Sequence, residues 1–405
     1  MGLFLSLAWR NLWRNRRRTL ITFAAIGVGV WSMITLAALM NAWAASTFQT
    51  AINTLTGHGQ IHAQNYRDDP GVEHAFPRPT GELKALLDAD AVKSWAARVQ
   101  VPAIVQSERN NAPVTLVGID PMQERGLSFI ADAVNEGRYL IGADEHGILL
   151  GHKLAQRLHT GLGKRVVLLS QGRDGNIAER GFRIVGIFSA DQAQSETRYV
   201  FIPRGQAQTM LGMGDEISEV SFILNNLDTL PDFLDQLRVI APELDIVAWF
   251  TLEPFTQAIL DISTGTIALW TVVMFILVAF GLVNTLLMAV YERTREFGLL
   301  QALGLRPRLI LLLVLLESLM LIGIGVAAGL ASGAVTVLAF HDGLEMGALA
   351  EGATMFGAGR VLYPQLDLSQ SLIIALFVWG MGVVTSLYPA WRAARQAPAA
   401  TINKL

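Results

Sequence analysis

ISTGTIALWTVVMFILVAFGLVNTLLMAVY, residues 262–291, is a run of 30 residues without a charged side chain. The hydrocarbon core of a bilayer is about 30 Å thick, and a helix crosses it with roughly 20 consecutive apolar residues. Three further windows are long enough by the same measure, at residues 20–45, 309–340 and 368–391. The sequence therefore predicts a membrane protein with four transmembrane helices.

Composition agrees with this prediction. Of the 405 residues 52% are hydrophobic and 16% are charged, whereas soluble domains carry about 25% charged residues. The exception is residues 46–261, between the first two windows, whose ordinary soluble composition suits one or two folded domains. The chain has no cysteine, so disulfides and cysteine-based metal chemistry are excluded.

The distribution of Lys and Arg gives the orientation, because these residues accumulate on the cytoplasmic side of a membrane. Five lie in residues 1–18, four in 292–308 and three in 392–405, but only Arg360 lies in 341–367. We therefore expect the first three segments to be cytoplasmic, and residues 46–261 and 341–367 to be outside. The predicted spans are 19–45, 262–291, 309–340 and 368–391.

The N-terminal 18 residues place Ala8, Trp9, Leu12 and Trp13 at helical spacing among arginines. This pattern predicts an amphipathic helix on the inner membrane surface. The window at residues 20–45 is longer than the 7–15 apolar residues of a secretory signal, so we expect it to remain as a span.

Residues 46–261 have a mixed pattern that predicts an α+β domain. Short β-branched runs bounded by Gly, Asp or Pro are typical of strands; they occupy residues 58–64, 113–119, 164–169, 182–188, 198–202 and 220–224. Helical patterns occupy residues 152–158, 205–211 and 227–238. The predicted fold class is thus four transmembrane helices with a large extracytoplasmic α+β domain between the first and the second.

No catalytic, metal or cofactor site is predicted in this domain. His58 and His62 alternate with apolar residues, which predicts a strand whose polar face is exposed, and this spacing is too wide for shared metal ligation. The motifs of serine hydrolases and zinc peptidases are missing from the sequence. The domain carries 18 basic and 27 acidic residues, a net charge of −9, which argues against nucleic-acid binding.

Two features of the third window predict helix contacts. Gly325, Gly329 and Gly333 fall on one helical face, where glycine allows close approach of another helix. Glu317 is the one charge inside a predicted span. A charge at this depth is costly, so we expect it either to be protonated or to pair with a basic group near the cytoplasmic end.

The segment YERTREFGLLQALG, residues 291–304, is the most informative one on the cytoplasmic side. It predicts a short amphipathic helix that ends at Gly304, and Pro307 prevents the helix from continuing. Phe297, Leu300 and Leu303 form its predicted apolar ridge. A simple turn does not need such a ridge facing water, so we expect a protein partner to bind it.

This segment resembles the E-R-x-R-E-[IF]-G-[IL]-L-x-A-L-G signature of the FtsX-like permease family. The stretches AWRNLWRNRRR, residues 8–18, and YPAWRAAR, residues 388–395, are also similar to that family, as is the layout of spans. The resemblance implies an ATP-binding-cassette (ABC) permease of a bacterial inner membrane whose large domain lies in the periplasm. Its coupling helix would contact a separate ATPase through Glu292, Arg293, Arg295, Glu296, Phe297, Gly298 and Leu299.

The resemblance also implies the partners. ATP and Mg²⁺ would bind to a separate ATPase dimer, since this sequence has no G-x-x-x-x-G-K-[ST] motif. A second permease, identical or related, would complete the membrane part, and a periplasmic lipoprotein carrier or cargo is a further expected partner.

Within the family, length and layout are most similar to the lipoprotein-releasing LolC and LolE branch. Acyl chains would then enter from the outer leaflet between the first two spans, near Met40, Trp43, Phe48, Ile262, Ile267 and Trp270. The alternative is a complex of the FtsX type, which transmits motion to a periplasmic partner and moves no substrate. A receptor without an ATPase would leave the coupling-like helix unexplained.

Overall fold

The computed structural model describes residues 2–142, 145–190, 192, 194–347 and 361–395. The chain divides into two compact units. We call residues 2–44, 260–345 and 361–395 the membrane unit, and residues 45–259 the outer unit. Arg360 and Lys404, which contributed to the predicted orientation, lie outside the described residues.

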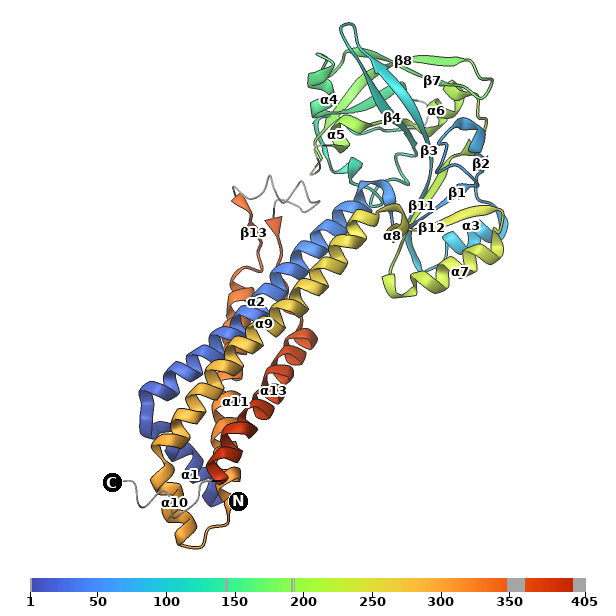
Figure 1. The fold of residues 1–405 in the computed structure, drawn as a ribbon. Coiled ribbons are helices and arrows are strands. Elements are labelled where there is room, and N and C mark those ends of the chain that lie inside the picture. Colours follow the sequence, from blue (N-terminus) through green and yellow to red (C-terminus); the bar gives the residue numbers. More distant parts are fainter. Residues whose placement is uncertain (1, 143–144, 191, 193, 348–360, 396–405) are drawn as a thin grey trace. The chain divides into compact units, whose positions relative to one another are not determined.

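Four helices are long and apolar enough to cross a membrane. They are α2 (Arg16–Ala51), α9 (Pro254–Glu292), α11 (Pro307–Ala339) and α13 (Leu368–Ala394) (Figure 1). A π-helical turn, η2 (Ile52–Thr56), extends α2. The first two spans therefore continue well beyond the predicted windows, because a helix needs only its own backbone hydrogen bonds and does not have to end where the hydrocarbon ends.

Short helices precede and connect these spans on the cytoplasmic side. They are α1 (Gly2–Leu12), the 3-10 turn η1 (Trp13–Asn15) and α10 (Thr294–Ala302), which lies between α9 and α11. Strands β13 (Leu344–Glu345) and β14 (Val361–Leu362) pair beyond α11.

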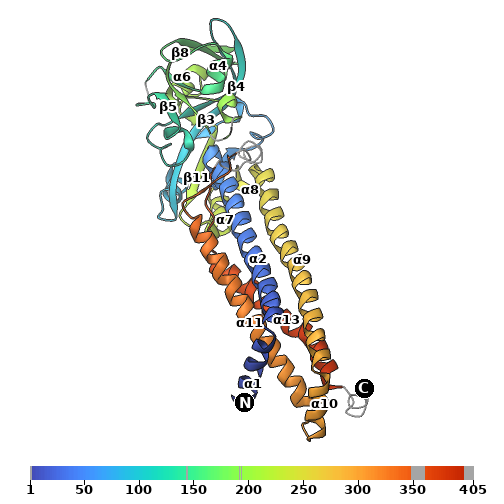
Figure 2. The same ribbon diagram turned by 90° about the vertical axis from the view of Figure 1, so that its left-hand side faces the viewer.

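The three glycines of α11 face α2, which lies beside α11 in Figure 2. An added Cβ at Gly325, Gly329 or Gly333 would lie 2.8, 2.6 or 3.0 Å from the side chains of Ile26, Val30 and Ile34, in that order. Both series advance by four residues in the same direction, so α2 and α11 are parallel. Small residues let the two backbones approach closely, and such packing drives helix association in lipid.

Helix α9 packs antiparallel to α2. Ser263 Oγ donates a hydrogen bond to the Met40 carbonyl (3.1 Å), and Trp270 Nε1 donates to Ser32 Oγ (3.3 Å). An apolar core joins all four spans, with Val30, Leu282, Ile322 and Val378 among its buried members. The membrane unit is therefore a closely packed four-helix bundle.

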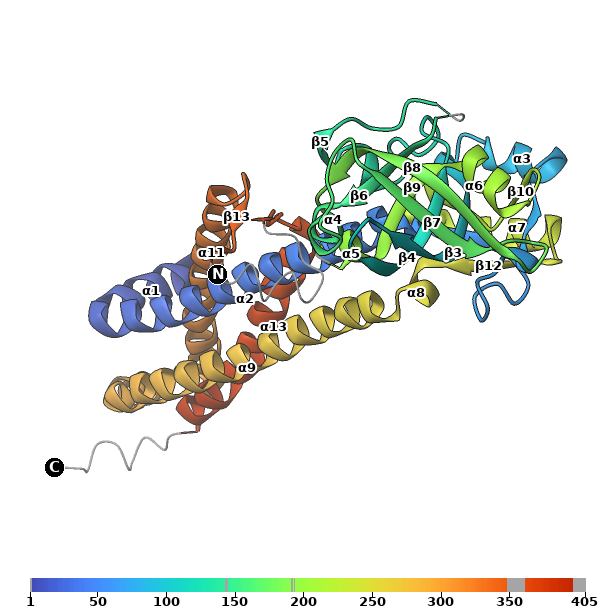
Figure 3. The ribbon, with the colours of Figure 1, turned by 90° about the horizontal axis from the view of Figure 1, so that it is seen from above.

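The outer unit is built on one large sheet, seen from above in Figure 3. Its strand order is β12-β1-β11-β3-β4-β9-β6-β8-β5, and β7 pairs with both β3 and β8. The strands are β1 (Gly59–Ala63), β3 (Val92–Gln106), β4 (Asn111–Ile119), β5 (Val134–Gly137), β6 (Gly147–Gly151), β7 (Arg165–Gln171), β8 (Ile177–Phe188), β9 (Tyr199–Pro203), β11 (Glu219–Leu224) and β12 (Leu244–Ala248). β2 (Phe76–Pro77) and β10 (Glu216–Ile217) form a separate pair.

Strand β3 joins the two halves of this sheet. Its first part pairs with β11 and its second part with β4 and β7. Helix α7 (Leu230–Ile240) packs on one half, where Phe233 contacts Phe222 of β11 with ring centroids 5.2 Å apart. Helices α3 (Gly81–Leu87), α4 (His152–Arg157), α5 (Ser195–Arg198), α6 (Arg204–Leu211) and α8 (Trp249–Leu252) complete the unit. The predicted α+β class is confirmed.

The glycine contact of α11 leads to a stability prediction. Gly329→Leu should lower the stability of the purified chain by about 1–3 kcal/mol, because the larger side chain forces α2 and α11 apart. Thermal unfolding in detergent measures the effect. Gly281→Leu on α9 is the matched control, since nothing lies within 4 Å of an added Cβ there. Equal stability of the two variants would contradict the packing role.

Candidate functional site

The candidate site is the cytoplasmic end of the membrane unit, built around α10. Arg293 interrupts the helical path with φ −104° and ψ 12°, and α10 starts directly after it. Gly304 ends the segment with φ +92°, a backbone conformation that glycine adopts without strain. Pro307 begins α11, where the missing N–H of proline has no cost. Thus α10 is fixed at both ends by the adjoining spans.

One face of α10 is buried within the chain. Phe297 is 1% exposed and packs in a cluster with Val290, Ile310, Val314 and Ala390. Leu300 packs against the same cluster. The predicted ridge is therefore wrong for these two residues: their side chains face this chain's own spans, because α11 and α13 provide an apolar surface there. Gly298 is also buried.

The opposite face of α10 is open. Leu299 is 51% exposed and Leu303 is 85% exposed, and Arg295, four residues before Leu299, is exposed as well. These three residues share one side of the helix, since they are spaced by four. An unpartnered apolar pair flanked by a cation is a surface that suits a protein partner.

Ion pairs lock α10 and the end of α9 in place. Arg14 Nη1 lies 2.7 Å from Glu296 Oε1, and Arg18 Nη1 lies 2.7 Å from Glu292 Oε2. Arg293 contacts Glu296 (3.2 Å) and stacks its guanidinium over the ring of Phe297, 5.1 Å from the centroid. Burial acts to raise the pKa of Glu296, but hydrogen bonds from Arg14 and Arg293 outweigh it, and the pKa lies below its usual value.

Of the two alternatives expected for Glu317, protonation or pairing with a basic group, the structure shows pairing. Its Oε2 accepts a hydrogen bond from Arg293 Nη1 at 2.8 Å, and both side chains are largely buried, 11% and 9% exposed. The pair joins the start of the α10 segment to the interior of α11. A buried charge without a partner is very costly, so this contact holds the two elements together.

The residues predicted to admit substrate differ in exposure, and one of them lies in the outer unit. Ile267 is 9% exposed and belongs to the bundle core, whereas Ile262 is 60% exposed and Trp270 is 38% exposed. Met40 and Trp43 are half-buried. Phe48 belongs to the outer unit, where it packs edge-on against Trp249 with centroids 4.9 Å apart. The direct α2–α9 packing explains the burial of Ile267.

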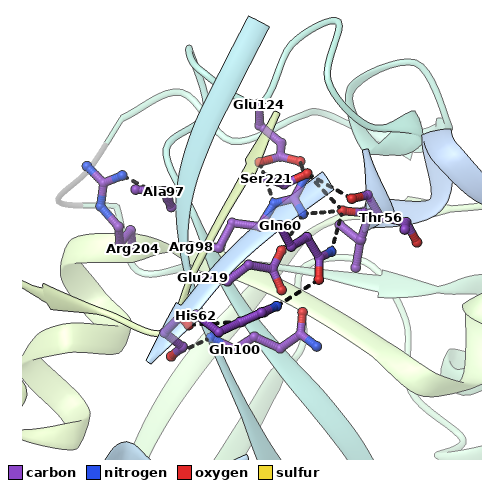
Figure 4. A network of polar contacts seen from close by, with 12 residues as sticks. Thr56, Gln60, His62, Ala97, Arg98, Gln100, Glu124, Arg204, Glu219 and Ser221 are labelled. Carbon is purple, nitrogen blue, oxygen red and sulfur yellow. Dashed lines mark hydrogen bonds and ion pairs between the residues drawn. The ribbon is translucent and has the colours of Figure 1, made fainter. Parts of the chain in front are cut away.

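A second polar cluster, which sequence reasoning missed, lies in the outer unit (Figure 4). Arg98 is completely buried and binds Glu124 through two hydrogen bonds, of 2.7 and 3.1 Å. Its Nη1 also donates to Glu219 Oε1 (2.8 Å) and to the Leu55 carbonyl (2.5 Å). Burial alone would lower the pKa of Arg98, but the two carboxylates raise it above the usual value.

These contacts close the end of the first long helix. Gln60 Nε2 and Ser221 Oγ join Arg98 in donating to the Leu55 carbonyl, at 3.3 and 3.2 Å. Leu55 has φ +151°, a strained value for a residue with a side chain. Three donors on one carbonyl stabilise this conformation, and the cation complements the negative end of the helix dipole.

The predicted exposed face of the strand at residues 58–64 is wrong. His62 is 2% exposed and Gln60 is 8% exposed; Tyr66 stacks on the His62 ring, and the Gln60 amide donates to the Leu55 carbonyl. The His62 ring nitrogens lie 3.0 Å from Gln60 Oε1 and 3.3 Å from the Ser218 carbonyl. Burial lowers the pKa of His62, although Glu219, Ser218 and Asp245 act in the opposite direction.

His58 does not share a site with His62. Its Nδ1 accepts a hydrogen bond from the Leu224 amide at 3.1 Å, so the two histidines are engaged separately. Across the part of the chain that the structure describes, no group of three His, Cys, Asp or Glu residues is arranged to hold a metal ion.

A four-helix membrane unit, an α+β domain inserted after its first span and a cytoplasmic helix with one open apolar face define a permease-type subunit. Comparison with known families agrees. The MacB-like periplasmic core domain model matches residues 19–240, more than half of the chain, and the FtsX-like permease C-terminal model matches residues 268–398. The chain belongs to the FtsX-like family of ABC transporter permeases.

Curated relatives span the whole chain. The lipoprotein-releasing system transmembrane protein LolC of Xylella fastidiosa is 24% identical over 99% of this chain and 98% of LolC. LolE of Haemophilus influenzae is 23% identical over 98% of both proteins. The pyoverdine export ATP-binding/permease protein PvdT of Pseudomonas syringae is 26% identical over 98% of this chain, which spans 58% of the length of PvdT.

Two solved structures are similar to about half of this chain. The periplasmic region of MacB from Actinobacillus actinomycetemcomitans covers 51% of this chain, with 95% of its own length, 14% identity and a TM-score of 0.36. The extracellular domain of the transporter YknZ from Gram-positive bacteria covers 47%, with 98% of its own length, 15% identity and a TM-score of 0.33.

The buried ion pair of the site predicts an asymmetric mutational effect. Glu317→Leu should destabilise the chain by about 3–5 kcal/mol, because Arg293 remains buried with less charge compensation. The double variant Arg293→Met/Glu317→Leu should lose much less, since it leaves no unpaired charge. Thermal unfolding in detergent provides the comparison. If the double variant is as unstable as the single one, the two residues are not coupled.

His62 predicts a pH effect on stability. Its folded pKa is lowered, so below its usual value of about 6.5 the unfolded chain binds more protons than the folded chain. Stability should therefore fall as pH drops through this value, and His62→Gln should weaken the dependence. Unfolding in detergent from about pH 7.5 to about pH 5.5 measures it. His146→Gln, at an exposed histidine, should behave as wild type; a wild-type slope in His62→Gln would disprove the assignment.

Proposed function

We propose that this permease couples ATP hydrolysis by a separate ATPase dimer to movement of its outer domain, in the release of lipoproteins from a bacterial inner membrane. The observation that carries the proposal is the two-sided character of α10. Phe297 and Arg293 bind it to the membrane unit, whereas Leu299 and Leu303 are left open on the other side.

The buried side of α10, held by Arg293 and Phe297, would keep the helix fixed to the spans during this coupling. A force applied to Leu299 and Leu303 reaches α11 through the Arg293–Glu317 pair and the Phe297 cluster. It reaches the start of α2 through Arg18 and Glu292. A docked ATPase would thus move α10 and the ends of three spans as one body. In this scheme Arg293, Glu296, Phe297 and Gly298 position α10, and Arg295 and Leu299 contact the ATPase.

The long helices provide the path outward. Helices α2 and α9 are continuous over Arg16–Ala51 and Pro254–Glu292, and η2 extends α2 as far as the non-helical Leu55. In the outer unit, Arg98, Gln60 and Ser221 hold the Leu55 carbonyl, and Thr56 Oγ1 donates to Glu253 Oε1 at 3.3 Å. A tilt of either helix would therefore act directly on the periplasmic sheet.

Lipoprotein release is favoured as the task because LolC and LolE match this chain over nearly their full length. These relatives are described as parts of a lipoprotein-releasing system. A second permease would complete the membrane part, and the lipid-facing sides of α2 and α9 would admit the acyl chains. The force-transmitting alternative uses the same coupling helix and differs only in its periplasmic partner.

Leu303→Glu tests the docking face. A carboxylate buried against the ATPase without a partner is costly, so copurification of the ATPase with the tagged chain should fall at least about tenfold. Val239→Glu is the matched control, since Val239 lies in the outer unit and is 80% exposed against 85% for Leu303. Mass spectrometry of the material purified in mild detergent gives both readouts.

Three outcomes of this purification decide between the alternatives. Unchanged ATPase recovery with Leu303→Glu would reject α10 as the docking face, and no ATPase with wild type would reject a separate ATPase. Lipid-modified proteins bound to wild type would support lipoprotein release. A resident protein without lipid in their place would support force transmission.

A further inference from the structure

The N-terminal segment carries five arginines that the structure separates into two groups. Arg14 and Arg18 are paired with Glu296 and Glu292. Arg10, Arg16 and Arg17 are exposed, and none of the hydrogen bonds or ion pairs found among the described residues uses their side chains. The ion pairs with Glu296 and Glu292 therefore use two of the five arginines. Among the described residues, the other three have no protein partner.

Two tryptophans lie among these free cations. Trp9 is 47% exposed and Trp13 is 44% exposed, and their rings meet edge to face with centroids 6.0 Å apart. Tryptophan is large and apolar but has an N–H group, so it is most stable at the boundary between hydrocarbon and water. An exposed pair of tryptophans is costly in water and favourable at a lipid headgroup.

The orientation of this surface is fixed by the other side of α1. Ala8 is completely buried and Leu12 is 4% exposed, where α1 packs against α11. The hydroxyl of Thr19 also donates to the Leu12 carbonyl at 2.6 Å. Because α1 cannot turn over without losing these contacts, Trp9 and Trp13 are held facing away from the bundle.

The depth of the surface is fixed by the start of the first span. Leu20 and Ile21, which follow the arginines after Thr19, are 51% and 62% exposed, and in a bilayer these apolar side chains would face hydrocarbon. Arg16 and Arg17 lie one turn before them on the same helix. In a bilayer this spacing would put Arg16 and Arg17 near the level of the lipid phosphates.

We propose that Arg10, Arg16 and Arg17, with Trp9 and Trp13, form a binding surface for anionic phospholipid headgroups of the cytoplasmic leaflet. Guanidinium groups bind phosphate through two parallel hydrogen bonds, and the tryptophans provide the apolar contact beside it. Arg14, in the same segment, pairs with Glu296 of α10, and Arg18 pairs with Glu292 at the end of α9. A bound anionic lipid would thus hold the N-terminal segment in place, and this segment contacts α10 through the Arg14–Glu296 ion pair.

Native mass spectrometry of the full chain in detergent tests the binding directly and needs no ATPase. Wild type should retain phosphatidylglycerol in preference to phosphatidylcholine with the same acyl chains. Arg10→Gln/Arg16→Gln/Arg17→Gln should reduce the affinity for phosphatidylglycerol by about fivefold per arginine, roughly a hundredfold in total. Arg→Lys at the same three positions should restore most of it, because the charge is kept.

The matched control changes three exposed arginines of the outer unit, Arg78→Gln/Arg109→Gln/Arg157→Gln, and should bind the lipid as wild type does. Equal retention of the two lipids by wild type, or undiminished phosphatidylglycerol binding by the N-terminal triple variant, would overturn the proposal. So would competition by soluble glycerol 3-phosphate, which would identify a phosphate site without lipid. Loss of the ATPase from the triple variant with lipid binding intact would assign the surface to the ATPase instead.

Discussion

The buried ion pair between Arg293 and Glu317 is the interaction on which the cytoplasmic end of this permease depends. A carboxylate inside a span is tolerated only with a partner, and the partner comes from the turn that begins α10. The orientation of α10 is therefore set from inside the bundle. With Arg293 in place, Phe297 enters the apolar cluster and Glu296 meets Arg14.

The outer end of the first span is closed by the same kind of interaction. Arg98, enclosed by Glu124 and Glu219, donates to the Leu55 carbonyl and supports the strained backbone at that residue. Arg293 and Arg98 are thus both buried, and each lies between two carboxylates. Buried ion pairs contribute little net stability but are very costly to break.

Locking one face of each cytoplasmic element leaves the opposite face for partners. On α10 the open residues are Leu299 and Leu303, and on the N-terminal segment they are the two tryptophans and three unpaired arginines. The first surface is apolar and suits a protein, whereas the second is cationic and aromatic and suits a lipid headgroup. Both connect to the same ion pairs, so occupancy of either surface bears on the position of α10.

The sequence by itself determined the class of this protein. Runs of 24 to 32 residues with at most one charge must lie in a membrane as helices, and the asymmetry of arginines follows from insertion, not from packing. Short strands and helices of the outer unit were also predictable, because the spacing of apolar residues and the turn residues act locally in the chain. Tertiary structure alone decided which polar residues are buried. His62 and Gln60 alternate like an exposed face, yet both side chains are buried, against Tyr66 and the Leu55 carbonyl. Phe297 matches a docking ridge, yet α11 and α13 enclose it. Arg98 has no local signal at all. Burial depends on neighbours distant in the chain, and a local pattern cannot show what covers it.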